Sequence, residues 1–272
     1  MGRIFRTEIA LGAPAPETPD SIADLFHENT KIRRATVALT AGDAYGVREI
    51  DAMARAGKRY PGHPQIALPP NTIRDGPPIG TVIDRRRTAG AFGAAPLALT
   101  DLAALLRWSY GVTGALATRG GGVQSLRAAP SAGALYPAEL YLAVRNVQDL
   151  EPGLYHFEVA TSSLARLRSG DHSAQLEAVC CGQRYARDAA VVILIAGVAD
   201  RTRRKYGDRG YRYVLLDIGH VGQNLCLAGE ALDLAVTTTC GFFDDEAADL
   251  LGLDGLDESV MYVAFIGPRA GA

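Results

Sequence analysis

The sequence predicts an α+β fold with a mixed, mainly antiparallel sheet flanked by helices. Short segments rich in Val, Ile, Leu and aromatic residues, at 138–145, 153–159 and 189–198, are predicted strands, and the longest helical pattern covers 211–235. The first two strands are joined by a short polar segment, which favours an antiparallel hairpin because parallel strands need a long crossover. The sequence contains no Rossmann G-x-G-x-x-G motif after a strand, no Walker A motif and no internal repeat.

The N-terminal part is expected to form an arm on the main domain. Residues 1–78 are predicted to be this extension, with one short amphipathic helix, and residues 79–272 are predicted to be the main domain. The short helix is expected to begin after Asp20 or Ser21, which are both typical N-cap residues. The Pro- and Gly-rich stretch 60–80 suits an extended segment that lies on another surface.

Further elements follow in the main domain. Thr100 is predicted to cap a helix that Gly111 ends, and the Gly-, Ser- and Pro-rich stretch 117–137 is predicted to be a loop. Cys180 and Cys181 are expected to be core thiols within a helix. The remaining predicted elements are that helix at 173–183 and strands at 235–239 and 259–267.

Composition narrows the class of protein. The chain has 28 basic and 30 acidic residues and a formal charge of −2, whereas nucleic-acid-binding proteins normally present a basic surface. Its longest apolar run, 189–199, is too short to span a bilayer, and no secretory signal is apparent. The four cysteines and five histidines lack the spacing of a disulfide framework or a metal site. We therefore expect a cytoplasmic protein without nucleic acid, membrane or metal as its ligand.

A basic cluster precedes the first helix that we predict in the main domain. Arg85, Arg86, Arg87 and Thr88 are consecutive, and forked guanidinium groups together with a hydroxyl are good donors to a phosphate dianion. The alternative is a solvated surface cluster, the usual role of a charge run.

Small residues at two places suit close approach of a flat ligand. The motif PSAGALYP at 130–137 places Ser131 and two small residues between prolines, so that backbone groups can reach a planar molecule. Ser131 as an acyl nucleophile and a plain tight turn are the competing interpretations. Gly219, Gly222 and Gly229 each cost the long helix about 1 kcal/mol relative to alanine, which suits either a ligand or tight helix packing.

Two weak acids stand just before the long helix. Lys205 and Tyr206 are adjacent, and burial of the lysine together with the nearby charges of Arg209 and Arg212 would lower the two pKa values, as a base that removes a proton from carbon requires. The alternative is an exposed loop leading into the helix. The acidic run 244–246 is expected to begin a helix and not to bind metal, because acids suit a helix N-terminus.

The order and spacing of several motifs resemble one family. Together they resemble the SagB-type dehydrogenases, the azoline-oxidase branch of the FMN-dependent nitroreductase superfamily. The motifs are RRTAGAF (86–92), PLALTDLAALLRWSYGVTG (96–114), PSAGALYPAELYLAV (130–144), PGLYHFE (152–158), KYGDRGYRYVLLDIGHVGQNLCLAGEALDLA (205–235) and GFFDDEAADLLGLDG (241–255).

The resemblance implies a nitroreductase-like fold whose homodimer holds two FMN molecules at the subunit interface. It also implies oxidation of thiazoline or oxazoline rings to azoles, with a cyclodehydratase as partner and a peptide or amino-acid-derived substrate. Lys205 and Tyr206 would be catalytic. The cofactor-binding residues implied by position are Arg86, Arg87 and Thr88 for the phosphate, Ser131, Ala132 and Gly133 along the isoalloxazine, Cys240, Gly241 and Phe242 from a second element, and Arg269 after the last strand.

One position departs from the family pattern. Gly90 stands where the family has an arginine, so that a phosphate contact would be missing or supplied by Arg85 or Arg119. Two other functions are weighed against the oxidase: an NAD(P)H-dependent nitro- or quinone reductase, and a non-catalytic scaffold subunit of a modifying complex.

Overall fold

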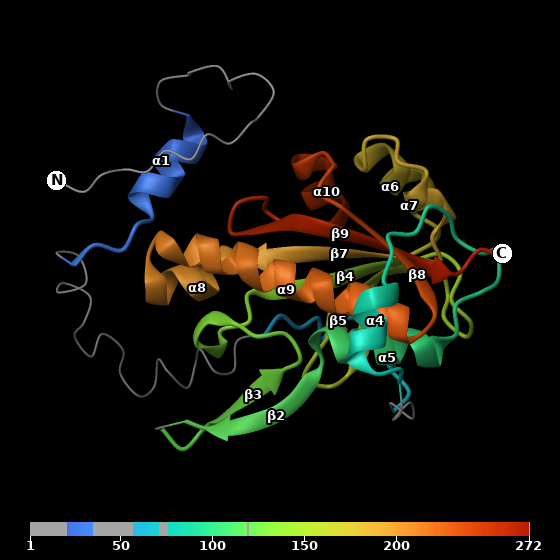
Figure 1. Ribbon diagram of the computed structural model, residues 1–272, viewed down its shortest axis with the longest axis horizontal. Coiled ribbons are helices and arrows are strands. Elements are labelled where there is room, and N and C mark those ends of the chain that lie inside the picture. The colour runs from blue at the N-terminus through green and yellow to red at the C-terminus, as the bar shows by residue number, and fades with distance from the viewer. Residues whose placement is uncertain (1–20, 35–56, 71–75, 119, 272) are drawn as a thin grey trace.

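The computed structural model describes residues 21–34, 57–70, 76–118 and 120–271. Its largest element is a seven-stranded sheet in the order β1-β6-β5-β4-β7-β9-β8, and each neighbouring pair is antiparallel (Figure 1). The predicted α+β class and the predicted hairpin are therefore confirmed. The strands of this sheet are β1 (Gln65–Ala67), β4 (Ala138–Val144), β5 (Gly153–Glu158), β6 (Ser163–Ser169), β7 (Val191–Val198), β8 (Leu234–Thr239) and β9 (Glu258–Pro268).

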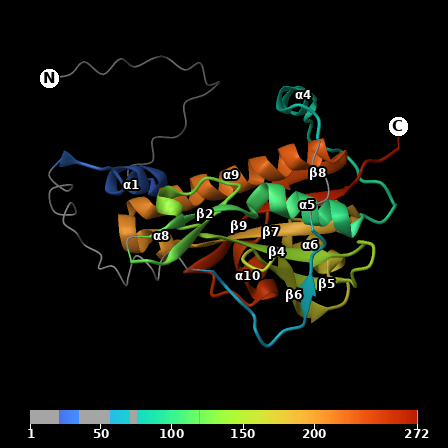
Figure 2. The same ribbon diagram turned by 90° about the horizontal axis from the view of Figure 1, so that it is seen from below.

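Helices cover both faces of the sheet. One face lies under α5 and α9, and the other lies under α6, α7 and α10 (Figures 1 and 2). Because side chains alternate along a strand, β4 directs Leu140 and Leu142 into the first core and Tyr141 and Ala143 into the second. The helices are α1 (Ile22–Asn29), α4 (Ile79–Arg85), α5 (Leu99–Tyr110), α6 (Ser173–Val179), α7 (Tyr185–Asp188), α8 (Ala199–Tyr206), α9 (Arg209–Ala231) and α10 (Asp244–Leu251).

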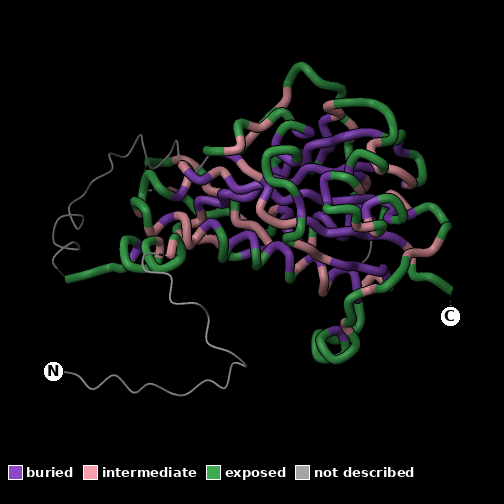
Figure 3. Tube along the Cα trace, turned by 90° about the horizontal axis from the view of Figure 1, so that it is seen from above, coloured by how far each residue is buried: buried purple, intermediate pink, exposed green. Residues whose placement is uncertain are grey.

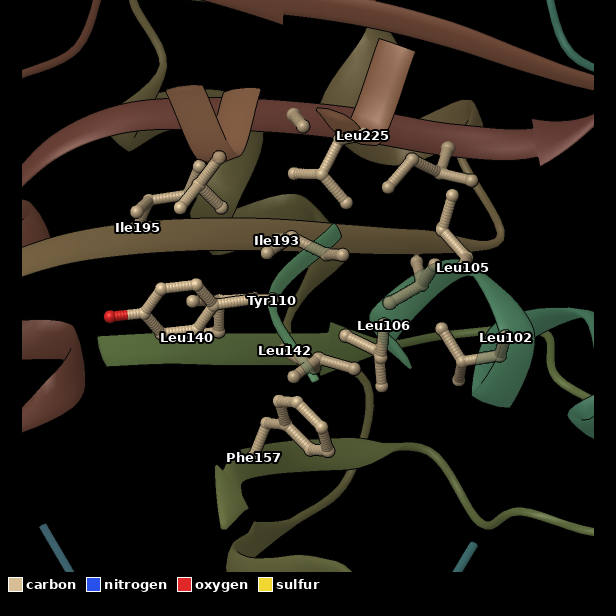
Figure 4. Close-up of a cluster of buried hydrophobic side chains, with 14 of the residues drawn as sticks. Leu102, Leu105, Leu106, Tyr110, Leu140, Leu142, Phe157, Ile193, Ile195 and Leu225 are labelled. Carbon is tan, nitrogen blue, oxygen red and sulfur yellow. The ribbon is translucent and has the colours of Figure 1, made fainter. Parts of the chain in front are cut away.

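Burial on both faces explains why the central strands are continuously apolar. β7 is buried almost throughout, as the Val- and Ile-rich run at 189–198 predicts. Figure 4 shows the first core, where Leu102 and Leu106 from α5 meet Leu142 of β4 and Ile193 of β7. Buried residues run through the middle of the domain, and exposed residues lie at its rim (Figure 3).

The glycines of α9 have different surroundings. A Cβ at Gly222 would lie 2.3 Å from the Tyr262 ring, and one at Gly229 would lie 2.3 Å from Val236. These two glycines therefore let the helix pack closely on β8 and β9. Gly219 has nothing within 4 Å of its Cβ position, so it leaves open space beside the helix.

Residues 57–70 of the predicted arm lie against the sheet. β1 pairs with β6 at one edge, which extends the sheet by a strand. The backbone N–H of Lys58 donates to Glu139 at 3.0 Å, and that of Tyr60 donates to Glu158 at 2.9 Å. Both carboxylates are buried, so this segment is bound to the main domain by charge-assisted hydrogen bonds.

The predicted helix at the N-terminus begins as expected. The Ser21 hydroxyl accepts from the Asp24 N–H at 3.2 Å, so Ser21 is its N-cap. Phe26 packs edge-to-face on Tyr211 at 5.9 Å, and Arg212 donates to the Thr30 hydroxyl at 2.6 Å. α1 therefore rests on the first turn of α9.

Several local predictions are wrong. The helix predicted to start at Thr100 has Ala98 as its N-cap, because the Ala98 carbonyl already accepts from Asp101 and Leu102. The stretch predicted to be a loop contains β3 (Val123–Arg127), which pairs with β2 (Val112–Ala117) directly before it in a separate antiparallel hairpin. Pairing across the hairpin overrides the weak β-propensity of its Gly- and Ser-rich sequence.

Two helix ends also differ from the prediction. α9 ends at Ala231, and Leu234 already belongs to β8. Cys180 is buried as predicted, but Cys181 is exposed with φ 55°, because α6 has ended before it. Among the helices of the described residues, none combines the length and apolar character needed to cross a membrane.

Candidate functional site

A groove lies beside α9, where the helix faces the segment after α4 and the strands β8 and β9. It has a volume of about 470 Å³. Three of the predicted site residues, Arg86, Thr88 and Cys240, line it together. The full lining is Arg86, Thr88, Leu215, Ile218, Gly219, Gly222, Gln223, Cys226, Thr238, Cys240, Met261 and Tyr262.

The groove lining combines a cation, a hydroxyl and a flat helix surface. Gly219 lies in the lining with open space at its Cβ position, so a planar group can approach the helix there. Burial raises the pKa of the Cys226 thiol, and the nearby charge of Arg86 partly offsets that rise. The positive charge of Arg86 therefore acts on a group that lines the groove.

The predicted basic cluster divides into groups with different partners. Arg86 forms no ion pair within the described part of the chain. Arg87 is exposed and donates to the carbonyls of Asp84 and Arg86, at 2.8 and 2.9 Å. Of these two arginines, Arg86 is thus the one positioned to bind an anion in the groove.

Two further arginines are held by one buried carboxylate. Glu230 accepts from Arg269 at 2.6 Å and pairs with Arg85 at 3.3 Å. Arg269 also pairs with Asp233 at 2.7 Å. Neither arginine lines the groove, although Arg269 shares Glu230 with Arg85, the residue before Arg86.

The residues predicted to line a flavin from the 130–137 motif lie on another side of α9. The Ser131 hydroxyl donates to the Asp217 carboxylate at 2.5 Å, and the Ala132 N–H also donates to it. On a helix with 3.6 residues per turn, Asp217 is rotated by about 100° from Ile218 and by about 160° from Leu215, which both line the groove. Ser131, Ala132 and Gly133 are not among the residues that line the groove within one chain.

Asp217 was missed by the sequence analysis. It is 5% exposed, on the same side of α9 as the buried Val214 and Val221. Burial raises the pKa of its carboxyl group, and the hydrogen bonds from Ser131 and Ala132 oppose that rise. The signal in the sequence was an aspartate on an otherwise apolar helix face, where a charge is costly unless it is bound.

The loop meets the predicted catalytic pair at Gly133. A Cβ at Gly133 would lie 2.6 Å from the Tyr206 hydroxyl and 2.8 Å from Lys205 Nζ, and the φ of 62° at this position also favours glycine. Lys205 and Tyr206 are the last two residues of α8 and do not belong to a loop. Lys205 is exposed, and the Tyr206 ring packs edge-to-face on Tyr213 at 5.0 Å.

The two arginines expected to act on this pair have other partners. Arg209 donates to the Thr30 carbonyl at 3.1 Å, and Arg212 donates to the Thr30 hydroxyl and the His27 carbonyl. Both guanidinium groups are therefore engaged in binding α1.

The loop around Gly133 has an unfavourable backbone. Gly133, Ala134 and Tyr136 have φ of 62°, 53° and 47°. The two non-glycine residues each cost about 1–2 kcal/mol in this left-handed region. Neighbouring groups hold them there: Gln124 donates to the Ala134 carbonyl, and Arg201 donates to the Tyr136 carbonyl at 3.1 Å.

The remaining predicted residues lie elsewhere or beyond the described chain. Phe242 is buried in the second core and does not line the groove. The Gly241 carbonyl accepts from Gln183 at 2.7 Å next to Cys240. Gly90 is exposed with open space at its Cβ position, and Arg119 lies outside the described residues.

Ser131 lacks the surroundings of an acyl nucleophile. Its hydroxyl donates to Asp217 and accepts from the Tyr136 N–H at 2.8 Å, and no histidine is among these partners. A carboxylate alone is too weak a base to generate a serine alkoxide. The structure therefore favours a positioning role for this hydroxyl.

The antiparallel sheet between two helical layers, with an Arg- and Thr-lined groove beside a long glycine-containing helix, defines a nitroreductase-like α+β protein. Residues 83–267 match the Nitroreductase family, and the chain belongs to this family. It is thus a nitroreductase-family oxidoreductase.

Two relatives illustrate the range of the family. A protein named as a nitroreductase from Methanocaldococcus jannaschii is 34% identical over 62% of this chain and 82% of its own length. The microcin B17-processing protein McbC of Escherichia coli is 31% identical over 51% of this chain and 53% of its own length. The chain thus spans about half the length of McbC.

Solved structures show the same fold. A structure named as a nitroreductase from Anabaena variabilis ATCC 29413 has a TM-score of 0.72 at 29% identity, over 94% of this chain and 49% of that one. A chain of the E. coli microcin synthetase McbBCD complex with truncated pro-MccB17 has a TM-score of 0.60 at 20% identity, over 92% of both chains.

Proposed function

We propose that this protein is an FMN-dependent oxidoreductase that dehydrogenates a thiazoline, an oxazoline or a related amino-acid-derived ring to an azole in natural-product biosynthesis. The observation that carries the proposal is the close approach of Gly133 to the side chains of Lys205 and Tyr206. A loop of small residues suited to a flat ring thereby lies directly beside an amine and a phenol that can transfer a proton.

The groove beside α9 fits an FMN molecule. Arg86 offers a guanidinium without an ion-pair partner in the described part of the chain and Thr88 offers a hydroxyl, which together suit the phosphate, while Gly219 leaves a flat surface. Members of the family typically bind flavin. In this proposal Cys240 lies along the cofactor. Arg87 and Arg269 lie near the phosphate site and stabilise the segments around it without touching the phosphate.

Two copies of the chain complete the site in this proposal. Arg86 and Gly219 lie on one side of α9, and Ser131, Gly133 and Lys205 lie toward another. Within one chain the body of the helix, about 10 Å across, lies between the two sets. A homodimer in which the groove of one copy faces the loop of its partner brings both sets together.

The chain's own residues supply binding and proton transfer. FMN, when bound, accepts two electrons and a proton from the substrate. Lys205 Nζ, with the Tyr206 hydroxyl beside it, takes a proton from the ring carbon next to a carbonyl or imine. The second hydrogen would leave the adjacent ring carbon as a hydride to bound FMN, so the ring would lose two hydrogens in total and become aromatic. Dioxygen or another acceptor would be the final oxidant.

The substrate class is supported by similarity to McbC, whose name assigns it to microcin B17 processing. By analogy, we propose a peptide or amino-acid-derived substrate and a cyclodehydratase partner that forms the azoline.

The proposal is tested by single turnover. Purified protein is titrated with FMN, and an azoline peptide is then mixed with the loaded protein without oxygen. We expect flavin absorbance to decrease and mass spectrometry to show a loss of two hydrogens. Lys205→Ala should slow this step by at least about 100-fold. Unchanged flavin reduction in that variant would contradict the role of Lys205, and failure to bind FMN would contradict the proposal.

A reductase is the second candidate, because relatives and neighbouring structures are named as nitroreductases. Rapid bleaching of the bound flavin by NADPH, without any reaction with the azoline, would favour it. A scaffold role requires no flavin, so absence of FMN binding would favour that instead.

A further inference from the structure

Asp217 occupies a position where an aspartate does not favour folding. It lies on the buried side of α9, and among the described residues no lysine or arginine forms an ion pair with it. His220, which is exposed on the same helix, contributes only to lowering the pKa of the Asp217 carboxyl group, and burial outweighs that contribution. A buried carboxylate without a cation is costly, and an apolar residue would stabilise the helix better.

The partners of Asp217 belong to a single loop. Its carboxylate accepts from the Ser131 hydroxyl at 2.5 Å and from the Ala132 N–H. The Ser131 oxygen in turn accepts from the Tyr136 N–H at 2.8 Å. The carboxylate therefore restrains the start of the 131–136 loop directly, and the Ser131 hydroxyl links that start to Tyr136 at its end.

That loop needs restraint because three of its residues have positive φ, and two of these are not glycine. Such a backbone persists only where its surroundings hold it. Gln124 and Arg201 hold the later carbonyls, at Ala134 and Tyr136. Asp217 is the group that holds Ser131 and Ala132, directly before Gly133.

We propose that Asp217 is the positioning residue of the active site: it fixes the 131–136 loop so that Gly133 stays against Lys205 and Tyr206 and the loop presents its small residues to the cofactor. The inference rests on the proposed function for the cofactor, but the contact between Asp217 and the loop does not. Asp217 acts through Ser131 and Ala132 and does not touch the reacting atoms.

If Asp217 is a positioning residue, its replacement should weaken FMN binding without lowering the stability of the fold. Asp217→Asn keeps the volume and removes the buried charge, but the amide accepts more weakly from two donors at once. We expect its Tm to stay within a few degrees of wild type or to rise. Hydrogen exchange of the apoprotein should become at least about tenfold faster in the 131–136 segment alone. FMN dissociation constants from fluorescence titration should increase about tenfold or more.

Ser131→Ala tests whether Asp217 influences FMN binding through its hydrogen bond with Ser131. Because Asp217 acts through Ser131, the double variant should weaken FMN binding less than the sum of the two single variants. Ser109→Ala is the matched control, since Ser109 is buried and donates only to the Leu105 carbonyl of its own helix. It should leave loop exchange and FMN affinity unchanged.

The outcomes separate the two proposals. Unchanged loop exchange and FMN affinity in Asp217→Asn, or equally faster exchange throughout the domain with a lower Tm, would overturn the positioning role. If the wild-type protein binds no FMN, the proposed function fails. Faster hydrogen exchange confined to the 131–136 loop in Asp217→Asn would then still support Asp217 as the residue that restrains the loop. Unchanged exchange in that variant would contradict this role as well.

Discussion

Arg201 and Glu139 form an ion pair, with 2.5 Å between Nη2 and Oε1, that ties α8 to β4. Glu139 is 3% exposed and also accepts from His156 Nε2 at 2.8 Å. Because Lys205 lies one turn after Arg201 on the same helix, this pair fixes the helix that carries the proposed base.

Breaking the pair should destabilise the protein. Among the described residues, Arg201→Ala leaves the buried carboxylate with His156 and the Lys58 N–H as its partners, and we expect a loss of about 3–5 kcal/mol in unfolding free energy. Urea denaturation measures it. Arg203→Ala is the matched control, because Arg203 is exposed and pairs with Asp200 and Asp208 at 3.6 Å, so its loss should stay below about 1 kcal/mol. Equal losses in both variants would contradict the importance of the buried pair.

Glu139 should also make the free energy of unfolding depend on pH in the acidic range. Burial alone would raise the pKa of its carboxyl group, but the hydrogen bond from His156 and the charge of Arg201 outweigh burial and lower the pKa from 4.5 to about 2. A pKa that is lower in the folded state contributes stability that is complete above about pH 4.5 and is lost as the pH falls toward 2. The contribution is about 3 kcal/mol.

The measurement is the unfolding free energy of wild type and Glu139→Gln between pH 6 and pH 2. We expect the wild-type curve to fall more steeply over this window. Parallel curves would show that another carboxyl group controls acid unfolding.

Arg86 and Arg87 should differ in their effect on FMN binding. Arg86 lines the groove without an ion-pair partner in the described chain, whereas Arg87 donates to the carbonyls of Asp84 and Arg86. We expect Arg86→Ala to weaken FMN binding about 10–100-fold, because a charge-assisted hydrogen bond contributes about 1.5–3 kcal/mol. Arg87→Ala should change it less than about threefold. Fluorescence titration measures both, and the reverse order would contradict the assignment of the phosphate site.

Alanine substitutions at two glycines of α9 should have opposite effects on stability. Gly222→Ala places a methyl group 2.3 Å from the Tyr262 ring, so overpacking should cost about 1–3 kcal/mol of stability. Gly219→Ala meets nothing in the protein and should stabilise the helix by up to about 1 kcal/mol. The same methyl group should weaken FMN binding, because it enters the groove.

Thermal unfolding and FMN titration of both variants test this pair. Undiminished FMN affinity in Gly219→Ala would place the flat ring away from this part of α9.

The sequence alone determined the parts of this protein that depend on neighbouring residues. The apolar runs at 138–145 and 189–198 and the helical pattern from 211 appear in the structure as β4, β7 and α9, because each is an uninterrupted local pattern. The resemblance to the SagB-type branch led to the nitroreductase family, which the match over 83–267 shows.

Tertiary structure decided what depends on residues far apart in the chain. β1, β2 and β3 form by pairing and lack a strong local signal. The bond from Asp217 to Ser131 and the meeting of Gly133 with Lys205 are set by how α9 and α8 pack on the sheet. Glu230 pairs with Arg85, whereas Arg86 has no ion-pair partner among the described residues, and no pattern within the basic cluster distinguishes the two. Such contacts join segments whose distance in sequence carries no information about their distance in space, so only the packed fold reveals them.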